Sequence, residues 1–179
     1  MKTKELPHHP AELEKLLELA GKANSILEIG SRYGVCLGMM ARRMPTKGRV
    51  VSVDLPNVFP WGYDSKAALL TEIGDLQEEG YWASVIFDDS TKPSVVEAVS
   101  KLGPFDLVFI DGDHRYEGVK KDWENYGPMG SVVVFHDIVK PAEYETHKTE
   151  VWKLWEEIEG KKESFIGEDS KMGLGIVYR

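Results

Sequence analysis

Cysteine is almost absent from this chain of 179 residues, which contains Cys36 alone. A single cysteine excludes an internal disulfide, and its apolar neighbours suggest that it is a small core side chain. The length predicts one domain over residues 1–179 that buries roughly 70% of its unfolded surface. Residues 1–10 contain two prolines and the pair His8-His9, so we expect a loose N-terminal lead-in there, a poor place for metal ligands.

Clusters of positive charge and long apolar runs are missing too. The formal net charge is −8, and the adjacent basic pairs are limited to Arg42-Arg43, Lys120-Lys121 and Lys161-Lys162. Non-specific binding to nucleic acid needs a basic face, so no nucleic-acid partner is expected. No apolar run approaches 18 residues and no signal peptide opens the chain, so we expect a cytoplasmic protein without a membrane partner. The sequence is compatible with a homo-oligomer as well as with a monomer.

Two enzyme signatures are also lacking. A G-x-S-x-G nucleophile elbow does not occur, so a hydrolase of that type is not favoured. A dinucleotide site needs G-x-G-x-x-G to seat a pyrophosphate, whereas here Arg32 occupies the place of the second glycine. A nicotinamide-dependent oxidoreductase is therefore not favoured.

The stretch from Ser25 to Asp54 has a clear pattern of strand, glycine turn, helix and strand. A unit of this kind presents a nucleoside at the carboxyl ends of its strands. Gly30 and Gly34 lack a Cβ, so the backbone can approach a ligand closely. Asp54 ends the second strand, where its carboxylate could accept hydrogen bonds from two ribose hydroxyls.

The spacing Glu28-x-Gly30-x-x-x-Gly34 resembles the first motif of the class I S-adenosylmethionine-dependent methyltransferases. That cofactor has no pyrophosphate and needs no tighter set of glycines. In this family an acid after the third strand binds the adenine amino group, and Asp89 fits that position better than Asp88; either acid could instead cap the next helix. The resemblance implies these cofactor-binding residues: Glu28, Gly30, Ser31, Gly34, Asp54, Leu55, Asp89 and Asp111.

Short apolar runs alternate with segments of helical period along the chain. We expect strands over residues 26–29, 49–53, 83–87, 105–110, 131–135, 163–166 and 174–178. We expect helices over residues 11–21, 35–44, 64–79, 93 to about 102, 115–126 and 150–159. The fold class is α/β, a doubly wound and mostly parallel seven-stranded sheet, and the family resemblance implies an antiparallel last strand.

Two of the apolar strands end in acids, Asp111 and Asp137. If these strands are neighbours in a parallel sheet, their axes lie roughly 4.8 Å apart. Two ionised carboxylates so close repel each other, unless one takes up a proton or both share a cation. The alternative is that Asp137 caps a turn while the adjacent His136 bonds the backbone.

The segments that contain these acids, Asp-Gly-Asp-His-Arg-Tyr from Asp111 and His-Asp-Ile from His136, are similar to a methyltransferase branch marked by D-G-x-H-x-Y and H-D-I. This branch includes O-methyltransferases that act on small molecules and sugars. The resemblance implies a divalent ion, Mg²⁺ or Mn²⁺, on Asp111, His136 and Asp137. Because imidazole suits a hard cation poorly, His136 favours Mn²⁺, Fe²⁺ or Zn²⁺.

His114 is the candidate general base, since an imidazole can take a proton from an attacking hydroxyl near neutral pH, and Asp113 could orient it. Asp111 is the second catalytic candidate. His114 could equally order its loop. Tyr116 and Asp122 recur in the family pattern, although helix packing and a solvated helix face would explain them.

The loop over residues 55–63 carries Phe59, Trp61 and Tyr63, and it could form a lid or fold onto the core. The sequence thus predicts methyl transfer from S-adenosylmethionine to a small-molecule acceptor; the alternative is a non-catalytic module that binds the nucleoside.

Overall fold

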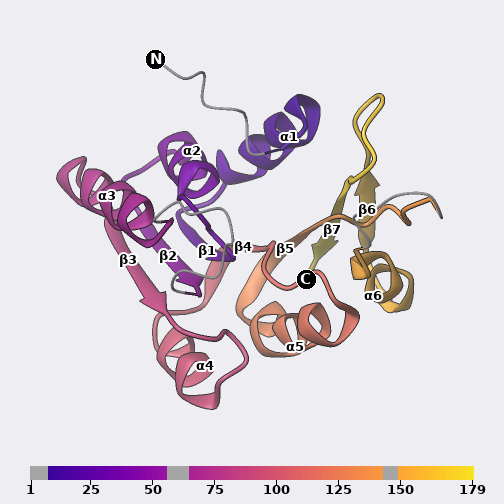
Figure 1. The fold of residues 1–179 in the computed structure, drawn as a ribbon. Helices are drawn as coiled ribbons and strands as arrows, with labels where there is room; N and C mark the ends of the chain where they lie inside the picture. Colours follow the sequence, from indigo (N-terminus) through magenta and orange to yellow (C-terminus); the bar gives the residue numbers. More distant parts are fainter. Residues whose placement is uncertain (1–7, 56–64, 143–148) are drawn as a thin grey trace.

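A seven-stranded sheet runs through the protein in the computed structural model, which describes residues 8–55, 65–142 and 149–179 (Figure 1). The strands are β1 (Ser25–Ile29), β2 (Arg49–Asp54), β3 (Trp82–Phe87), β4 (Phe105–Ile110), β5 (Gly130–His136), β6 (Lys162–Phe165) and β7 (Leu174–Tyr178). Their spatial order is β3-β2-β1-β4-β5-β7-β6, and β7 runs antiparallel to both of its neighbours. The predicted doubly wound α/β fold with an antiparallel last strand is confirmed.

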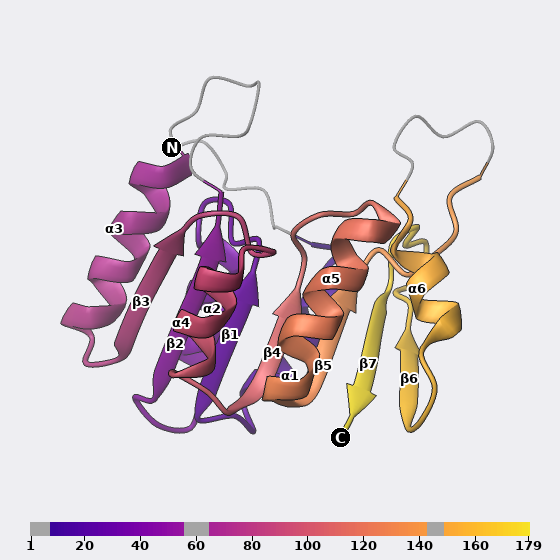
Figure 2. The ribbon, with the colours of Figure 1, turned by 90° about the horizontal axis from the view of Figure 1, so that it is seen from below.

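In the described parts of the chain, three helices cover each face of the sheet, as Figures 1 and 2 illustrate. One face carries α1 (Pro10–Ala20), α2 (Val35–Arg43) and α3 (Ser65–Glu78), and the other carries α4 (Pro93–Ser100), α5 (Tyr116–Tyr126) and α6 (Val151–Glu157). Successive strand residues supply the two cores: Ile26 packs with α1 to α3, and Leu27 packs with α4 and α5. Burial on both faces explains why the central strands are continuous apolar runs.

The N-terminal segment differs from the predicted lead-in. Helix α1 already begins at Pro10, whose fixed φ suits the first helical position, and it ends before Gly21 as expected. His8 is 9% exposed, and its ring makes an edge contact with Phe109 at 5.6 Å between ring centroids. The prediction of a loose segment is therefore wrong for residues 8–10.

The strand order reverses at β1, which pairs with β2 on one side and with β4 on the other. Ile29 is in register with both Val53 and Ile110, so the residues that follow these three strands meet at one edge of the sheet. This is the position at which open α/β sheets bind ligands. Among the described residues no helix is both long and apolar enough to cross a membrane.

Candidate active site

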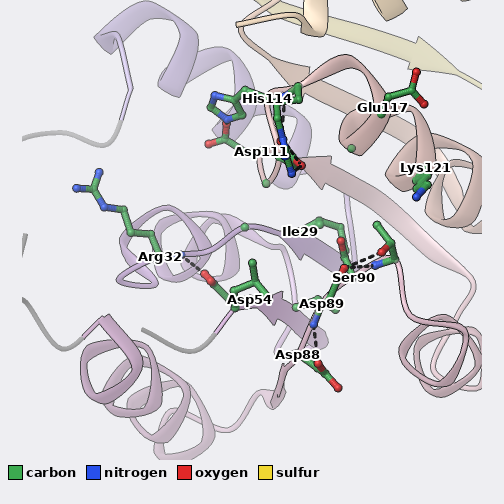
Figure 3. Close-up of a pocket in the computed structure, with 18 of the residues that line it drawn as sticks. Ile29, Arg32, Asp54, Asp88, Asp89, Ser90, Asp111, His114, Glu117 and Lys121 are labelled. Carbon is green, nitrogen blue, oxygen red and sulfur yellow. Dashed lines mark hydrogen bonds and ion pairs between the residues drawn. The ribbon is translucent and has the colours of Figure 1, made fainter. Parts of the chain in front are cut away.

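A cavity of about 880 Å³ opens at this edge of the sheet, over the carboxyl ends of β1, β2, β3 and β4 (Figure 3). Acidic side chains outnumber basic ones around it. The acids are Asp54, Asp88, Asp89, Asp111, Asp113, Glu117 and Glu150, against Arg32, Arg115 and Lys121. An excess of carboxylates focuses a negative potential into a cleft, which favours a ligand that carries positive charge.

The turn after β1 is shaped by Gly30, which lines the cavity with φ +90°. A Cβ at this position would lie 2.4 Å from the backbone oxygen of Asp111, so only glycine fits. Two hydrogen bonds tie the turn into the sheet: the Gly30 N–H donates to Val53 O, and the Asp111 N–H donates to Ile29 O, both at 2.9 Å. The turn and the loop after β4 thus form one rigid rim.

Asp54 lies at the tip of β2 and faces the cavity, as its position in the sequence predicts (Figure 3). One of its carboxylate oxygens accepts the backbone N–H of Arg32, a residue that adopts the left-handed φ of +51°. Burial raises the pKa of Asp54, and the N–H groups of Arg32, Leu55 and Ser31 oppose that rise. The carboxylate is therefore oriented by the glycine turn. Leu55, the next residue, also lines the cavity.

Three other residues of the first motif lie behind the cavity wall. Glu28 is 1% exposed, and burial raises its pKa to about 8 although the neighbouring Ser31 and Cys36 side chains oppose that rise. The buried Ser52 hydroxyl donates to that of Ser31 at 2.7 Å. Gly34 precedes α2 with φ +76°, and a Cβ there would press on Leu69 and Glu72 of α3. Among the residues that line the cavity, Gly34 does not appear, so here it serves helix packing.

The two acids after β3 both line the cavity but have different partners. Asp88 pairs with Lys92 at 2.6 Å. Asp89 accepts the N–H and the hydroxyl of Thr91, each at 2.8 Å, in a turn ahead of α4. The N-cap position of α4 belongs to Lys92 and has no side-chain cap. Neither acid therefore caps the helix directly, and Asp89 is fixed by its own loop at the cavity edge.

The acids Asp111 and Asp137 meet through His114, as predicted for neighbouring strand ends. His114 Nδ1 lies 2.9 Å from Asp137 Oδ2, and its Nε2 lies 3.2 Å from Asp111 Oδ1. Burial disfavours charge on the ring, but the two carboxylates outweigh it and raise the pKa of His114 to about 10. In this arrangement His114 holds a proton at neutral pH. The imidazole can act as a base only when other groups bind the two carboxylates, so that the ring loses this proton.

His136 and Asp137 face the same cluster, although strand alternation alone would direct them to opposite sides. Strand β5 ends at His136, and Asp137 takes the left-handed φ of +64°. His136 Nδ1 then lies 3.5 Å from Asp111 Oδ1 and 3.4 Å from Asp137 Oδ1. The alternative in which His136 only bonds the backbone does not match these contacts.

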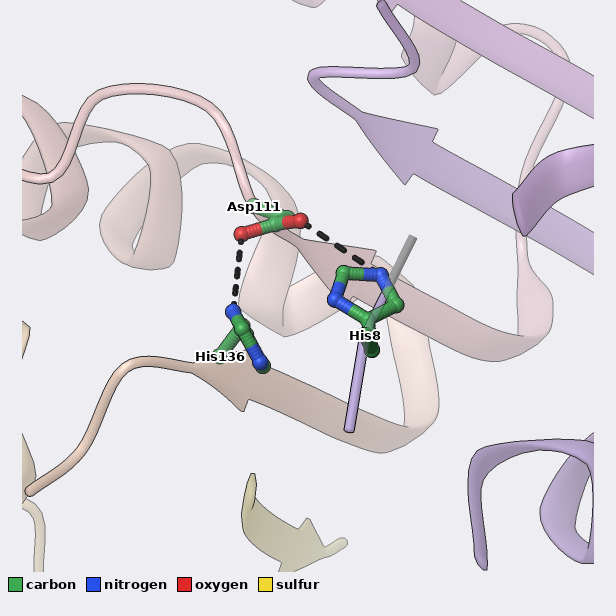
Figure 4. A group of neighbouring side chains, drawn as sticks. All are labelled: His8, Asp111 and His136. Atoms are coloured by element: carbon green, nitrogen blue, oxygen red, sulfur yellow. Dashed lines mark ion pairs between the residues drawn. The ribbon is translucent and has the colours of Figure 1, made fainter. Parts of the chain in front are cut away.

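Two further members of this cluster are Glu12, which was not anticipated from the sequence, and His8, which was expected to be a poor ligand in a loose segment. Glu12 of α1 is fully buried and lies 3.5 Å from His136 Nε2, and His8 Nε2 lies 3.7 Å from Asp111 Oδ2 (Figure 4). The pKa of Glu12 is about 2, because hydrogen bonds from His136, Ser170 and Gly167 outweigh the effect of burial. Glu12 stands four residues before Leu16, on the apolar stripe of its helix. A carboxylate on a buried stripe is the sequence signal that could have indicated its place in the cluster.

The alternative explanation of Asp122, a solvated helix face, is wrong. Asp122 is 1% exposed and accepts a hydrogen bond from the Ser90 hydroxyl at 2.7 Å. Burial raises the pKa of Asp122 to about 6. Its role here is to join α5 to the loop after β3, beneath the cavity.

The loop that carries His114 is held from the far side by Glu150, ahead of α6. The Glu150 N–H donates to His114 O at 2.7 Å, and its carboxylate accepts the Tyr116 N–H at 3.0 Å. These bonds cap the start of α5 and fix the position of His114. The predicted lid residues Phe59, Trp61 and Tyr63 lie outside the described residues.

Comparison with known proteins adds to this geometry. Residues 27–138 match a family model described as a methyltransferase domain. A catechol O-methyltransferase from Niastella koreensis is 30% identical over 111 residues, which are 60% of this chain and 45% of that protein. An uncharacterised protein of Sinorhizobium fredii, y4gI, is 37% identical over 76 residues, 41% of this chain and 8% of that protein. The chain therefore spans less than half the length of these curated relatives.

The fold is shared with solved structures. The O-methyltransferase TomG of Streptomyces achromogenes, solved in complex with SAM, superposes with a TM-score of 0.69 at 16% identity. The match covers 97% of this chain and 81% of that one. At this identity the likeness concerns the fold alone.

Proposed function

Because this chain belongs to the methyltransferase-domain family, we propose that it transfers a methyl group from S-adenosylmethionine to a hydroxyl group of a small molecule. The observation that carries the proposal is one cavity with two kinds of group: Asp54 on one side, and Asp111 with His114 on the other. The first group suits a nucleoside, and the second suits proton removal from an acceptor. The hydroxyl-methylating relative, a catechol O-methyltransferase, supports the same class of acceptor.

The residues present fit the cofactor. Asp54 would accept the ribose hydroxyls, the close backbone at Gly30 would admit the ligand, and Asp89 would face the adenine. The acid-rich wall suits a cationic ligand. When bound, S-adenosylmethionine supplies an electrophilic methyl group on a positively charged sulfur.

The acceptor side would depend on the cluster of Asp111, His114 and Asp137. A divalent cation on Asp111, His136 and Asp137 would supply positive charge that lowers the pKa of an acceptor hydroxyl. Engaging Asp111 and Asp137 in this way also removes the negative charge that keeps the proton on His114. The imidazole, 38% exposed at the cavity, could then accept the proton of the acceptor. Holding the acceptor and the methyl group together would lower the activation free energy by about 7 kcal/mol or more.

Two measurements on the full chain test this proposal. Calorimetry with S-adenosylhomocysteine is expected to give one site per chain. Incubation with S-adenosylmethionine carrying a labelled methyl group, Mn²⁺ and a panel of catechols, other phenols and sugars is expected to label at least one hydroxyl compound. If S-adenosylhomocysteine does not bind, the proposal is overturned. Binding without transfer to any hydroxyl would instead support the nucleoside-binding module.

A further inference from the structure

We propose that His8, Asp111 and His136 form a binding site for a transition-metal ion of the zinc type, with a ligand contributed by the N-terminal segment. This deepens the proposed function where it concerns metal assistance, because it adds His8 to the ligand set proposed above and concerns the same ion; Asp137 Oδ1 remains beside it, 3.4 Å from His136 Nδ1. Metal binding itself does not depend on methyl transfer. The three side chains come from the segment before α1, the end of β4 and the end of β5, and they point toward one another (Figure 4). One ligand atom from each lies within 4.8 Å of the others.

The distances between these atoms suit an ion better than direct hydrogen bonds. His8 Nε2 is 3.7 Å from Asp111 Oδ2, and His136 Nδ1 is 3.5 Å from Asp111 Oδ1. Nitrogen–oxygen hydrogen bonds are shorter, roughly 2.7–3.2 Å. Two ligand atoms that each lie about 2.0–2.2 Å from a tetrahedral ion are separated by roughly 3.3–3.6 Å. Asp111 can thus offer one oxygen toward each histidine with an ion between them.

The surroundings support the same assignment. Metal-bound histidines usually donate their second N–H to a carboxylate, which fixes the tautomer and the ring. Here His136 Nε2 faces Glu12 Oε2 at 3.5 Å, which is longer than a hydrogen bond but places the carboxylate on the far side of the ring, and Nδ1 is directed at Asp111. Glu12 is fixed in turn, because its Oε1 accepts the N–H groups of Gly167 and Gly173 at 3.2 and 3.1 Å. Glu12 is therefore a positioning residue for this site.

The donor set determines the class of ion. Two imidazoles and one carboxylate suit Zn²⁺, Fe²⁺ or Co²⁺, whereas Mg²⁺ prefers oxygen ligands and keeps several waters. His8 and His136 are 9% and 5% exposed, and their ring centroids are 4.4 Å apart, so both ligands are already arranged in a protected place. Asp111 belongs both to this cluster and to the cavity wall, which puts the ion beside the proposed acceptor.

Titration of the full chain with Co²⁺, after removal of metals by a chelator, tests the proposal through the visible absorption of the bound ion. We expect one Co²⁺ per chain, displaced by Zn²⁺ and not by Mg²⁺ at the same concentration. His8→Gln should lower the Co²⁺ affinity by about 100-fold or more. Loss of a residue that only supports a ligand, without binding the ion itself, costs about 10- to 100-fold. His9→Gln, a change at the adjacent histidine outside the cluster, should keep the affinity of the native chain.

Two results would overturn the proposal: a native chain that does not bind Co²⁺, or His8→Gln with unchanged Co²⁺ affinity. Thermal unfolding in the presence of chelator, expected to be alike in both variants and the native chain, separates loss of a ligand from loss of the fold. If S-adenosylhomocysteine fails to bind while Co²⁺ binds as described, the proposed function fails and the metal site stands.

Discussion

Replacing Asp54 with alanine is expected to weaken the binding of S-adenosylhomocysteine by about 100-fold. The carboxylate is held at the tip of β2 by the Arg32 N–H and faces the cavity. Hydrogen bonds to a charged group contribute about 1.5–3 kcal/mol each. Loss of two such bonds to the ribose, taken at the lower end, amounts to about 3 kcal/mol, which corresponds to that change in affinity. Calorimetry of the variant measures it directly.

Asp88 offers a matched control for this experiment. It is another acid of the same cavity wall, but its carboxylate lies beside Lys92 at the surface. Asp88→Ala should therefore retain the native affinity for S-adenosylhomocysteine. Equal losses in both variants would indicate a general electrostatic effect of the acidic wall, and native affinity in Asp54→Ala would contradict the ribose role.

A second large effect is expected for Asp111→Asn, which preserves the size of the side chain and removes its charge. Asp111 lies within 3.7 Å of nitrogens in three histidines, His8, His114 and His136. Without this carboxylate, the proposed divalent cation loses a ligand and His114 loses the partner that orients its ring. Proton transfer by a positioned group contributes about 10²–10⁴-fold to rate, so kcat should fall within that range. Steady-state kinetics with a methylated acceptor provides the measurement.

The control for this change is Asp113→Asn, two residues further along the same loop. Asp113 pairs with Arg115 through two of its guanidinium nitrogens, at 2.9 and 2.5 Å, and takes no part in the histidine cluster. Its kcat should stay close to the native value. The affinity for S-adenosylhomocysteine should fall by about tenfold in Asp111→Asn, which corresponds to the loss of one hydrogen bond to a charged group at the lower end of its range. A fall in affinity with unchanged kcat would contradict the assignment.

Local patterns were sufficient to predict the sheet and the edge at which the site lies. The run from Phe105 to Ile110 is apolar throughout because it is buried on both faces, and the acid that follows it must lie at a strand end. Gly30 could also be placed from the local pattern, because a strand-to-helix turn needs backbone freedom. Gly34 follows the same motif, yet its space is required by side chains of α3, a contact that the motif alone does not encode.

The members of the histidine cluster that come from the N-terminus could not be predicted in this way. His8 and Asp111 are separated by about a hundred residues, and their meeting depends on how α1 docks over the ends of β4 and β5. A histidine pair ahead of a helix looks like an unpacked segment until that docking is known. Asp122 is a similar case: on a polar helix it looks solvated, but in the fold it is buried and bonded to the Ser90 hydroxyl.

A crystal structure of the chain with S-adenosylhomocysteine would test the central claim most directly, namely that the edge of the sheet beside Gly30 and Asp54 binds the nucleoside. We predict that the ribose hydroxyls lie within hydrogen-bonding distance of Asp54, with the homocysteine sulfur facing the side of the cavity that holds Asp111 and His114. A nucleoside bound elsewhere, or a ribose directed away from Asp54, would contradict the account.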